Sequence, residues 1–313
     1  MFYRLLLEFL AAAVAAGTPL LFAILGEIYT EKAGNLNLGV EGMMLMGAVV
    51  GFQVGLATSN PYLALAGASA AGALGALIFS ILTVSMRANQ VVSGLALTIF
   101  GAGFSGLLGQ KLVGQVSPEN LKNFFQAFSF PLLGDIPFFG KVFFQQDIFV
   151  YAGYIVAIVL GIYLYKTRAG LNLRVTGENP GAADAAGINV ELYKYIHILF
   201  GGALCGLGGA YLSLVYIPAW QENVVAGRGW IAVALVIVTA WNPYKAILGA
   251  YMFGALDIAG LWLQTFHFPI SQYFMDMLPY VVTILVLIFT SIKKSKENAP
   301  PQGLGVPFFR EDR

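Results

Sequence analysis

Polar residues with the potential for chemistry interrupt an apolar run at residues 34–42, which read GNLNLGVEG. Glycines and asparagines at such a position are typical of a broken membrane helix whose backbone lines a cavity. We expect Asn35, Asn37 and Glu41 to lie on a pathway for a polar solute, because ionisable groups within membrane segments are functional candidates. Two other interpretations of Glu41 stay open: its carboxylate is buried and paired, or it lies at the cytosolic rim.

A second polar cluster covers residues 87–94, which read RANQVVSG. Asn89, Gln90 and Ser93 fall within about one helical turn, since a turn takes about 3.6 residues. Their amide and hydroxyl groups could donate and accept hydrogen bonds with a polar solute. A plain helix start explains these residue types equally well.

Two further clusters contain tryptophans. Trp230 follows the polar stretch 221–229 and could stack on a flat solute or belong to an interfacial aromatic belt. Trp241-Asn242-Pro243 separates two apolar runs, and Asn242 is a candidate for the solute pathway. Asp257 lies within a later apolar run, where we expect it to make a buried polar contact.

None of the enzyme signatures that we sought accompanies these clusters. No GxxxxGK[ST] phosphate loop is present, because Gly140-Lys141 is followed by Val142, and neither HExxH nor GxSxG occurs. Two histidines and one cysteine provide neither a zinc cluster nor an intrachain disulfide. We therefore expect no enzyme activity, no metal site and no cofactor bound by this chain. If transport uses ATP, a partner subunit must bind the ATP and Mg²⁺.

The composition predicts the elements that position these residues. The 313 residues are 58% hydrophobic and 11% charged, whereas soluble domains carry about 25% charged residues. An integral membrane protein follows, and the net charge of +1 argues against nucleic acid as a partner. The apolar start resembles a signal peptide, but it continues to about Ile28 and therefore predicts a first membrane helix.

A membrane-spanning helix needs about 20 mostly apolar residues. No alternation typical of a barrel strand occurs, so we expect an all-α polytopic bundle. Eight to ten crossings fit the sequence. Nine candidate spans cover residues 5–28, 36–57, 62–86, 91–109, 148–165, 192–215, 229–241, 245–265 and 273–292.

Lys and Arg concentrate on the cytoplasmic side of membrane proteins. With nine spans and a cytoplasmic C-terminus, 12 of the 17 Lys and Arg residues lie inside. This distribution predicts an outside N-terminus and places the polar interval 166–191 in the cytosol.

That interval contains the signature of a short helix at about 178–187. Asn179 is a good N-cap, Pro180 suits the first helical position, and Gly187 suits the left-handed residue after the helix. A helix specified in this way outside the membrane indicates a docking element for a cytosolic partner. We expect this element to be formed by Gly177, Glu178, Asn179, Pro180, Ala182, Ala183 and Gly187.

The remaining segments complete the predicted organisation: a permease domain at 1–292 and a polar, partly disordered tail at 293–313. The aromatic outer loop 110–147 predicts interfacial helices packed on the bundle, or alternatively a landing surface for a substrate-delivery protein. Gly47, Gly51 and Gly55, and likewise Gly202 and Gly206, predict close helix packing.

Four stretches together resemble a known family: NLNLGVEGMMLMGA (35–48), NQVVSGLAL (89–97), GLNLRVTGENPGAADAAGINV (170–190) and AGRGWIAVALVIVTAWNP (226–243). They are similar to inner-membrane permeases of ABC importers in the ribose and branched-chain amino-acid branch. Within it they most resemble the shorter subunit of the nucleoside permease pair that works with a basic-membrane-protein lipoprotein. The resemblance covers about residues 17–292, and Thr239-Ala240 replaces a common Gly-Arg.

The resemblance implies a multi-pass subunit in a bacterial cell membrane that translocates nucleosides or a related small polar solute. It also implies a second related permease subunit, cytosolic ATP-binding subunits, and an extracellular or periplasmic substrate-binding protein. The segment around residues 178–180 would match the family's coupling helix. The alternative is a secondary transporter or channel that works without ATP, which requires charged residues paired deep within the spans.

Overall fold

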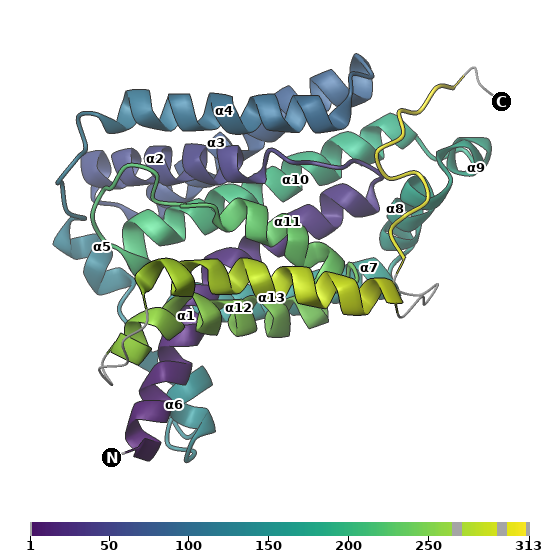
Figure 1. Cartoon of the computed structure of the whole chain (residues 1–313). Helices are drawn as coiled ribbons and strands as arrows, with labels where there is room; N and C mark the ends of the chain where they lie inside the picture. The colour runs from purple at the N-terminus through teal and green to yellow at the C-terminus, as the bar shows by residue number, and fades with distance from the viewer. Residues whose placement is uncertain (1, 265–270, 293–298, 311–313) are drawn as a thin grey trace.

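Helices dominate the computed structural model of the protein, which describes residues 2–264, 271–292 and 299–310. Figure 1 shows an elongated bundle with two distinct ends. We call one end the α9 end, because it carries α8, α9 and the C-terminal segment. The opposite end, the α5 end, carries α5, α6 and the N-terminus.

Within the described residues, six helical segments are long and apolar enough to cross a membrane. This finding supports a multi-pass, mostly helical membrane protein. The six segments are α1 (Phe2–Lys32), α2 (Val40–Thr58), α3 (Pro61–Ser80) with the π turn η1 (Ile81–Ser85), α4 (Gln90–Gly109), α7 (Ile148–Lys166), and α10 (Val190–Tyr211) with the π turn η2 (Leu212–Tyr216).

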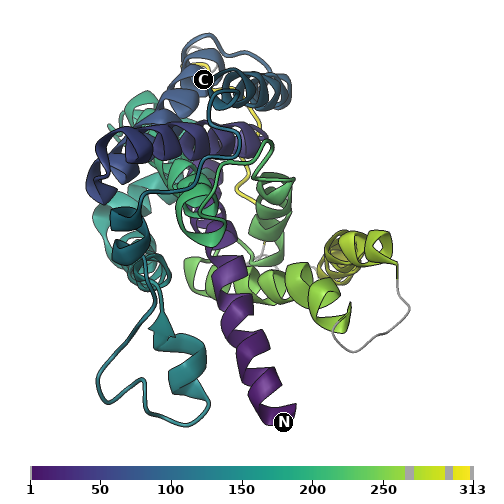
Figure 2. The same cartoon turned by 90° about the vertical axis from the view of Figure 1, so that its left-hand side faces the viewer.

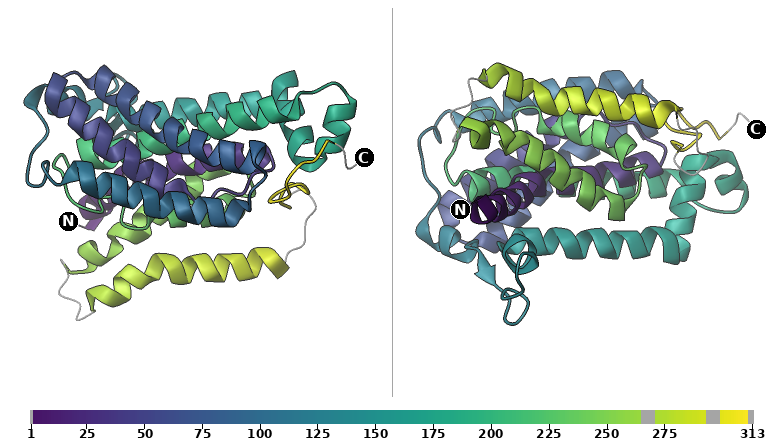
Figure 3. Two further views of the ribbon diagram at one scale, coloured as in Figure 1. Left: turned by 90° about the horizontal axis from the view of Figure 1, so that it is seen from above. Right: turned by 60° about the horizontal axis from the view of Figure 1, so that its bottom comes forward.

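Three further helices occupy the last three predicted spans: α11 (Arg228–Val238), α12 (Pro243–Gln264) and α13 (Gln272–Ile292). The 11 residues of α11 rise only about 16 Å, about half of the hydrocarbon thickness. α11 is therefore a half-helix, and the non-helical residues 217–227 precede it. The total of nine crossings remains a prediction. α13 packs on α11 and α12 at the margin of the bundle (Figures 2 and 3).

Glycines bring the central helices into close contact, as their spacing predicts. A Cβ atom on Gly47 of α2 would overlap the backbone of Gly206 of α10, and one on Gly202 would overlap Ala76 of α3. Gly51 lies against Ala68 of α3. Because lipid provides little hydrophobic drive for helix association, this close packing supplies much of the cohesion of the bundle.

The loop 110–147 contains α5 (Glu119–Phe124) and α6 (Phe139–Phe143), and a two-stranded antiparallel ribbon of β1 (Phe128–Ser129) and β2 (Gln145–Gln146). The ribbon is a small departure from the all-α expectation. Phe125 is buried 5.5 Å from the ring of Phe149, so the loop packs on the bundle as predicted. Its role as a landing surface stays a prediction.

Asp147 joins this loop to α7. Its Oδ1 accepts a hydrogen bond from the backbone N–H of Phe149 (2.8 Å), and its Oδ2 accepts one from the hydroxyl of Tyr211 (3.0 Å). Burial raises the pKa of the Asp147 carboxyl, and these donors oppose that rise. The residue thus anchors the loop to two helices.

The interval 166–191 forms two helices, where the sequence predicted one at about 178–187. α8 spans Arg168–Glu178 and α9 spans Pro180–Ala185, with Asn179 between them. Asn179 has φ −149° and ψ 89°. This break follows from Pro180, because a proline disfavours the helical conformation of the preceding residue.

Residues 299–310 form a non-helical segment with a turn at 302–305, and it lies against α8 and α9 (Figure 1, yellow). The sequence predicted a partly disordered tail at 293–313, of which residues 293–298 and 311–313 lie outside the described residues. In the described part, backbone hydrogen bonds tie Gly303 and Gly305 to the bundle. The prediction of disorder rested on polar composition. Composition does not show that backbone groups of the tail form hydrogen bonds with other segments.

Candidate functional site

The non-helical segment 34–39 between α1 and α2 is held by a carboxylate inside the bundle. Glu27 of α1 accepts hydrogen bonds from the backbone N–H of Asn37 (3.1 Å) and from its side-chain amide (3.2 Å). The Asn37 Oδ1 accepts a third bond, from the N–H of Gly39 (2.9 Å). All three residues are buried. Non-helical backbone at membrane depth requires such partners.

α4 holds the same segment from the other side. The Gln90 Oε1 accepts a hydrogen bond from the backbone N–H of Leu36 (2.7 Å), and the Thr98 hydroxyl donates to the carbonyl of Leu38 (2.9 Å). The structure therefore brings the first two sequence clusters together into one site. We call this site, residues 34–39 with residues 87–98 at the start of α4, the re-entrant site.

Two buried polar atoms of the re-entrant site have no hydrogen-bond partner among the described residues. They are the acceptor Asn35 Oδ1 and the donor Gln90 Nε2. Buried polar atoms normally find a partner. The site therefore contains one acceptor and one donor whose hydrogen bonds the described residues do not supply.

Other predicted pathway residues have structural partners. The Asn89 Oδ1 accepts a hydrogen bond from the N–H of Val92 (3.0 Å) and caps α4, which supports the plain helix start for this residue. Ser93 is buried one turn further along α4. The Asn242 Oδ1 caps α12 by accepting a hydrogen bond from Tyr244 N–H (2.9 Å).

Glu41 is buried and paired. Its carboxylate accepts hydrogen bonds from the backbone N–H groups of Gly227 (2.8 Å) and Gly229 (2.7 Å) at the start of α11. A helix N-terminus carries unsatisfied donors and partial positive charge, which suit a carboxylate. Glu41 therefore fixes the half-helix to α2, and Trp230, which follows directly, is left 37% exposed.

Asp257 makes a polar contact, but the residue is exposed, so the expectation that the contact is buried is wrong. The Arg228 guanidinium lies 2.7 Å from the Asp257 carboxylate, which joins α11 to α12. Sequence reasoning missed Arg228 as the partner, because 29 positions separate the two residues and no helix-face pattern connects them.

Glu31 is a second residue that sequence reasoning missed. The indole N–H of Trp241 donates to the Glu31 carboxylate, and the Lys32 ammonium lies 5.7 Å from the indole ring. Thus the Trp-Asn-Pro break between α11 and α12 is pinned to the end of α1. No local pattern pointed to Glu31 as a partner of Trp241, because the neighbouring residues at the end of α1 are polar as well.

At the α9 end, the capping signals of the sequence are realised. The Asn179 Oδ1 accepts a hydrogen bond from Ala182 N–H (2.9 Å), Pro180 begins α9, and Gly187 has φ +82°. Glu178, Asn179, Ala182 and Gly187 are exposed, whereas Gly177 and Ala183 are buried. The buried pair supports the element from within, and the exposed residues form its outer face.

Comparison with known proteins agrees with this arrangement. The model of the family described as "Branched-chain amino acid transport system / permease component" matches residues 9–287. A "Putative glucose ABC transporter permease protein" of Haloferax volcanii is 36% identical, covering 96% of this chain and 97% of that protein.

Two bacterial relatives show comparable similarity. A guanosine ABC transporter permease of Bacillus subtilis is 34% identical over 96% of both chains. A nucleoside ABC transporter permease of Lactococcus lactis is 35% identical, covering 86% of this chain and 88% of that protein. The resemblance drawn from the four sequence motifs is confirmed. The chain is a membrane transport component and belongs to the family of branched-chain amino acid transport system permease components.

Proposed function

We propose that this chain is a permease subunit of an ATP-driven importer for nucleosides or a related small polar solute. An external binding protein delivers the solute, a second related permease subunit completes the pathway, and cytosolic subunits hydrolyse ATP with Mg²⁺. The relatives named for guanosine and nucleosides support this solute class. The protein lies in a bacterial cell membrane with its N-terminus outside and its C-terminus in the cytoplasm.

The observation that carries the proposal is α9. It is a capped helix of six residues that packs on α8 and α10 and leaves its outer face uncovered. A helix this short is not stable alone, so its caps and the support of Ala183 hold it in place. This element offers a firm surface on which an ATPase subunit can push.

The re-entrant site supplies weak polar contacts along the route of the solute. The free Asn35 Oδ1 and Gln90 Nε2 match the donors and acceptors of a nucleobase or a sugar. An importer must release its cargo, so a few hydrogen bonds suit this role better than a tight pocket.

The first test is purification of the chain from native membranes followed by identification of bound ATPase subunits. We expect an ATPase to co-purify, and uptake of labelled guanosine to stop when ATP is depleted with ion gradients intact. Uptake that survives ATP depletion, with no ATPase bound, would contradict the proposal.

The docking face is tested by Glu178→Lys, which reverses a charge on the exposed surface beside α9. We expect the variant to insert in the membrane normally but to lose ATPase association and uptake. The matched control is Arg4→Glu, an exposed charge reversal in the first turn of α1. Normal transport by Glu178→Lys would refute the docking role.

A transporter driven by an ion gradient is the alternative, and the Arg228–Asp257 ion pair is the observation that favours it. The pair joins two helices and is only partly exposed, as a coupling site would require. Asp257→Asn discriminates the two functions. An importer driven by ATP keeps ATP-dependent uptake in this variant, whereas a gradient-driven transporter loses its coupling.

A further inference from the structure

The C-terminal residues 301–310, which we call the strap, cross the α9 end of the bundle. The strap first contacts the junction of α8 and α9. The backbone N–H of Gln302 donates to the Glu178 carboxylate (3.1 Å), and the N–H of Gly303 donates to the carbonyl of Gly177 (2.9 Å). Pro301 is buried in this contact region. The strap is thus anchored where the two cytosolic helices meet.

The strap then reaches both parts of the re-entrant site. The N–H of Gly305 donates to the carbonyl of Gly34, at the turn where α1 ends (3.3 Å). The Arg87 guanidinium lies 4.7 Å from the ring of Phe309, a distance at which a cation and an aromatic face attract. Gly305 and Pro307 also close a hollow of about 300 Å³ beside residues 87–91.

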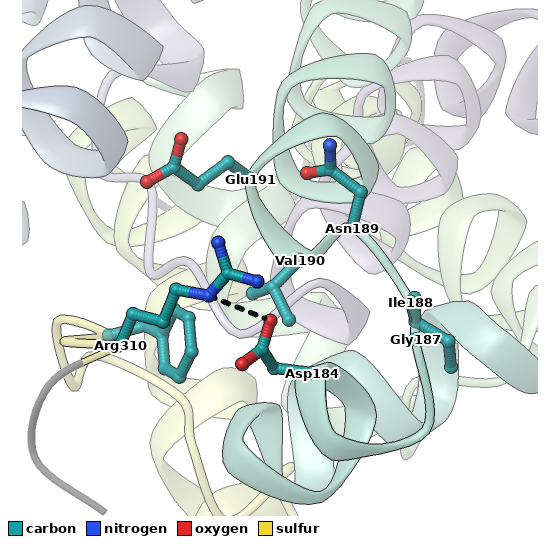
Figure 4. A pocket seen from close by; sticks show the side chains of 8 residues that line it. Asp184, Gly187, Ile188, Asn189, Val190, Glu191 and Arg310 are labelled. Carbon is teal, nitrogen blue, oxygen red and sulfur yellow. Dashed lines mark ion pairs between the residues drawn. The ribbon is translucent and has the colours of Figure 1, made fainter.

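The end of the strap returns to α9. The Arg310 guanidinium lies 3.3 Å from the Asp184 carboxylate, as the dashed line in Figure 4 shows. Phe308 and Arg310 line a hollow of about 270 Å³ with residues 184 and 187–191, at the junction of α9 and α10. Backbone N–H groups therefore connect the strap to the end of α8, and one ion pair connects it to α9.

These contacts add to a direct one, because Gly177 at the end of α8 already lies against Lys32 and Gly34. Within the described residues, α9 packs on α8 and α10, and α4 packs on α2, α3 and η1. We propose that the strap is a positioning device that transmits displacement of α9 to the Gly34 turn and to the start of α4. The device rests on the proposed function, because it requires an ATPase that moves α9. It connects the docking face to the two sides of the re-entrant site.

Each single contact of the strap is weak, so we expect the contacts to act together. The Arg310 side chain is 73% exposed, and ion pairs of this kind change an equilibrium by about fivefold at most. Coupling between distant sites through packed segments reaches about 30-fold. Loss of the complete strap should therefore have a larger effect than loss of Arg310 alone.

The main experiment ends the chain after residue 298 and measures uptake in the assembled transporter. We expect the ATPase subunit to remain bound, because the outer face of α9 is retained, while solute uptake per ATP hydrolysed falls by about tenfold. An unchanged ratio would overturn the proposal. An increase in uptake would also overturn it, because the strap would then inhibit transport.

A point substitution guards against a folding defect of the shortened chain. Arg310→Glu should lower the same ratio by about threefold, and the charge-swapped double variant Arg310→Glu with Asp184→Lys should recover part of it. Arg4→Glu, an exposed charge reversal in the first turn of α1, is the matched control. Equal ratios for Arg310→Glu and the control would contradict the role of the strap.

Hydrogen exchange separates failure of the strap from failure of the proposed function. The amide protons of Gly303 and Gly305 should be protected in the unaltered protein and exchange faster in Arg310→Glu, whatever drives transport. Unprotected amides in the unaltered protein would refute the strap alone. If the amides are protected but no ATPase binds the unaltered chain, the proposed function fails instead.

Discussion

At the residue scale, the acidic side chains inside the bundle serve as anchors for irregular backbone. Glu27 holds the re-entrant segment, Glu31 holds Trp241, and Glu41 holds the start of α11. Each carboxylate accepts hydrogen bonds from an amide or an indole N–H. A buried carboxylate that accepts hydrogen bonds is a stable arrangement, so we interpret these residues as structural anchors.

Glu41→Gln tests this interpretation. The amide keeps the shape of the side chain but replaces one acceptor by a donor that faces a backbone N–H. Because hydrogen bonds to charged groups contribute about 1.5–3 kcal/mol each, we expect a loss of about 2 kcal/mol in stability. Thermal unfolding of the purified protein in detergent measures this change.

The control for Glu41→Gln is Glu119→Gln, at an exposed position in the first turn of α5. This substitution should leave the unfolding temperature unchanged. If Glu41→Gln keeps full stability and only raises the KM for solute uptake, Glu41 binds the solute directly and the anchoring role is wrong.

At the element scale, the helices break at several of the predicted polar clusters. The chain leaves helical geometry at 34–39, at Asn179, at 217–227 and at 239–242. Ala240 and Trp241 have φ of 54° and 53°, a left-handed conformation that is unusual for residues other than glycine. The contact of Trp241 with Glu31 holds this turn in place, so the break between α11 and α12 is fixed in its geometry.

The cap of α9 allows a matched pair of substitutions. Asn179→Ala removes the acceptor for Ala182 N–H, and the loss of an N-cap costs about 1 kcal/mol. In a helix of six residues this cost falls on the whole element, so we expect weaker ATPase association and slower uptake. Co-purification and uptake assays measure both effects.

Asn179→Asp is the control, because aspartate is an equally good N-cap and keeps the acceptor in place. It should retain both ATPase association and uptake. If Asn179→Ala behaves like Asn179→Asp in both assays, the order of α9 does not matter for docking.

At the scale of the whole molecule, close approach of α2, α3 and α10 determines the architecture. Gly47 and Gly72 both contact Gly206 of α10, and Ala68 of α3 lies against it as well. Because neighbouring backbone occupies the space, a larger residue at position 206 would separate three helices together.

Gly206→Leu should therefore destabilise the bundle by about 3 kcal/mol and reduce the amount of folded protein in the membrane. Gly103→Ala is the matched control in α4, where a Cβ atom would meet nothing within 4 Å. Removing a mid-helix glycine should stabilise the protein by about 0.5–1 kcal/mol. Size-exclusion profiles and unfolding temperatures compare the two. A folded, monodisperse Gly206→Leu protein would contradict the packing argument.

The sequence alone determined the features that depend on local composition. Apolar runs of sufficient length predicted the membrane helices, because the thickness of the bilayer sets their length. Asn179, Pro180 and Gly187 predicted both ends of α9, because capping uses neighbouring backbone groups. The four family motifs were also local, and the family match confirmed them.

Only the tertiary structure decided which distant groups meet. It paired Glu41 with Gly227, Arg228 with Asp257, and Glu31 with Trp241, each across more than 25 positions of sequence. It also placed the tail on α8 through the backbone of Gly303 and on α9 through the ion pair of Arg310 with Asp184. Backbone amides are the same in every sequence, so no residue pattern reveals which of them a remote carboxylate or carbonyl will bind.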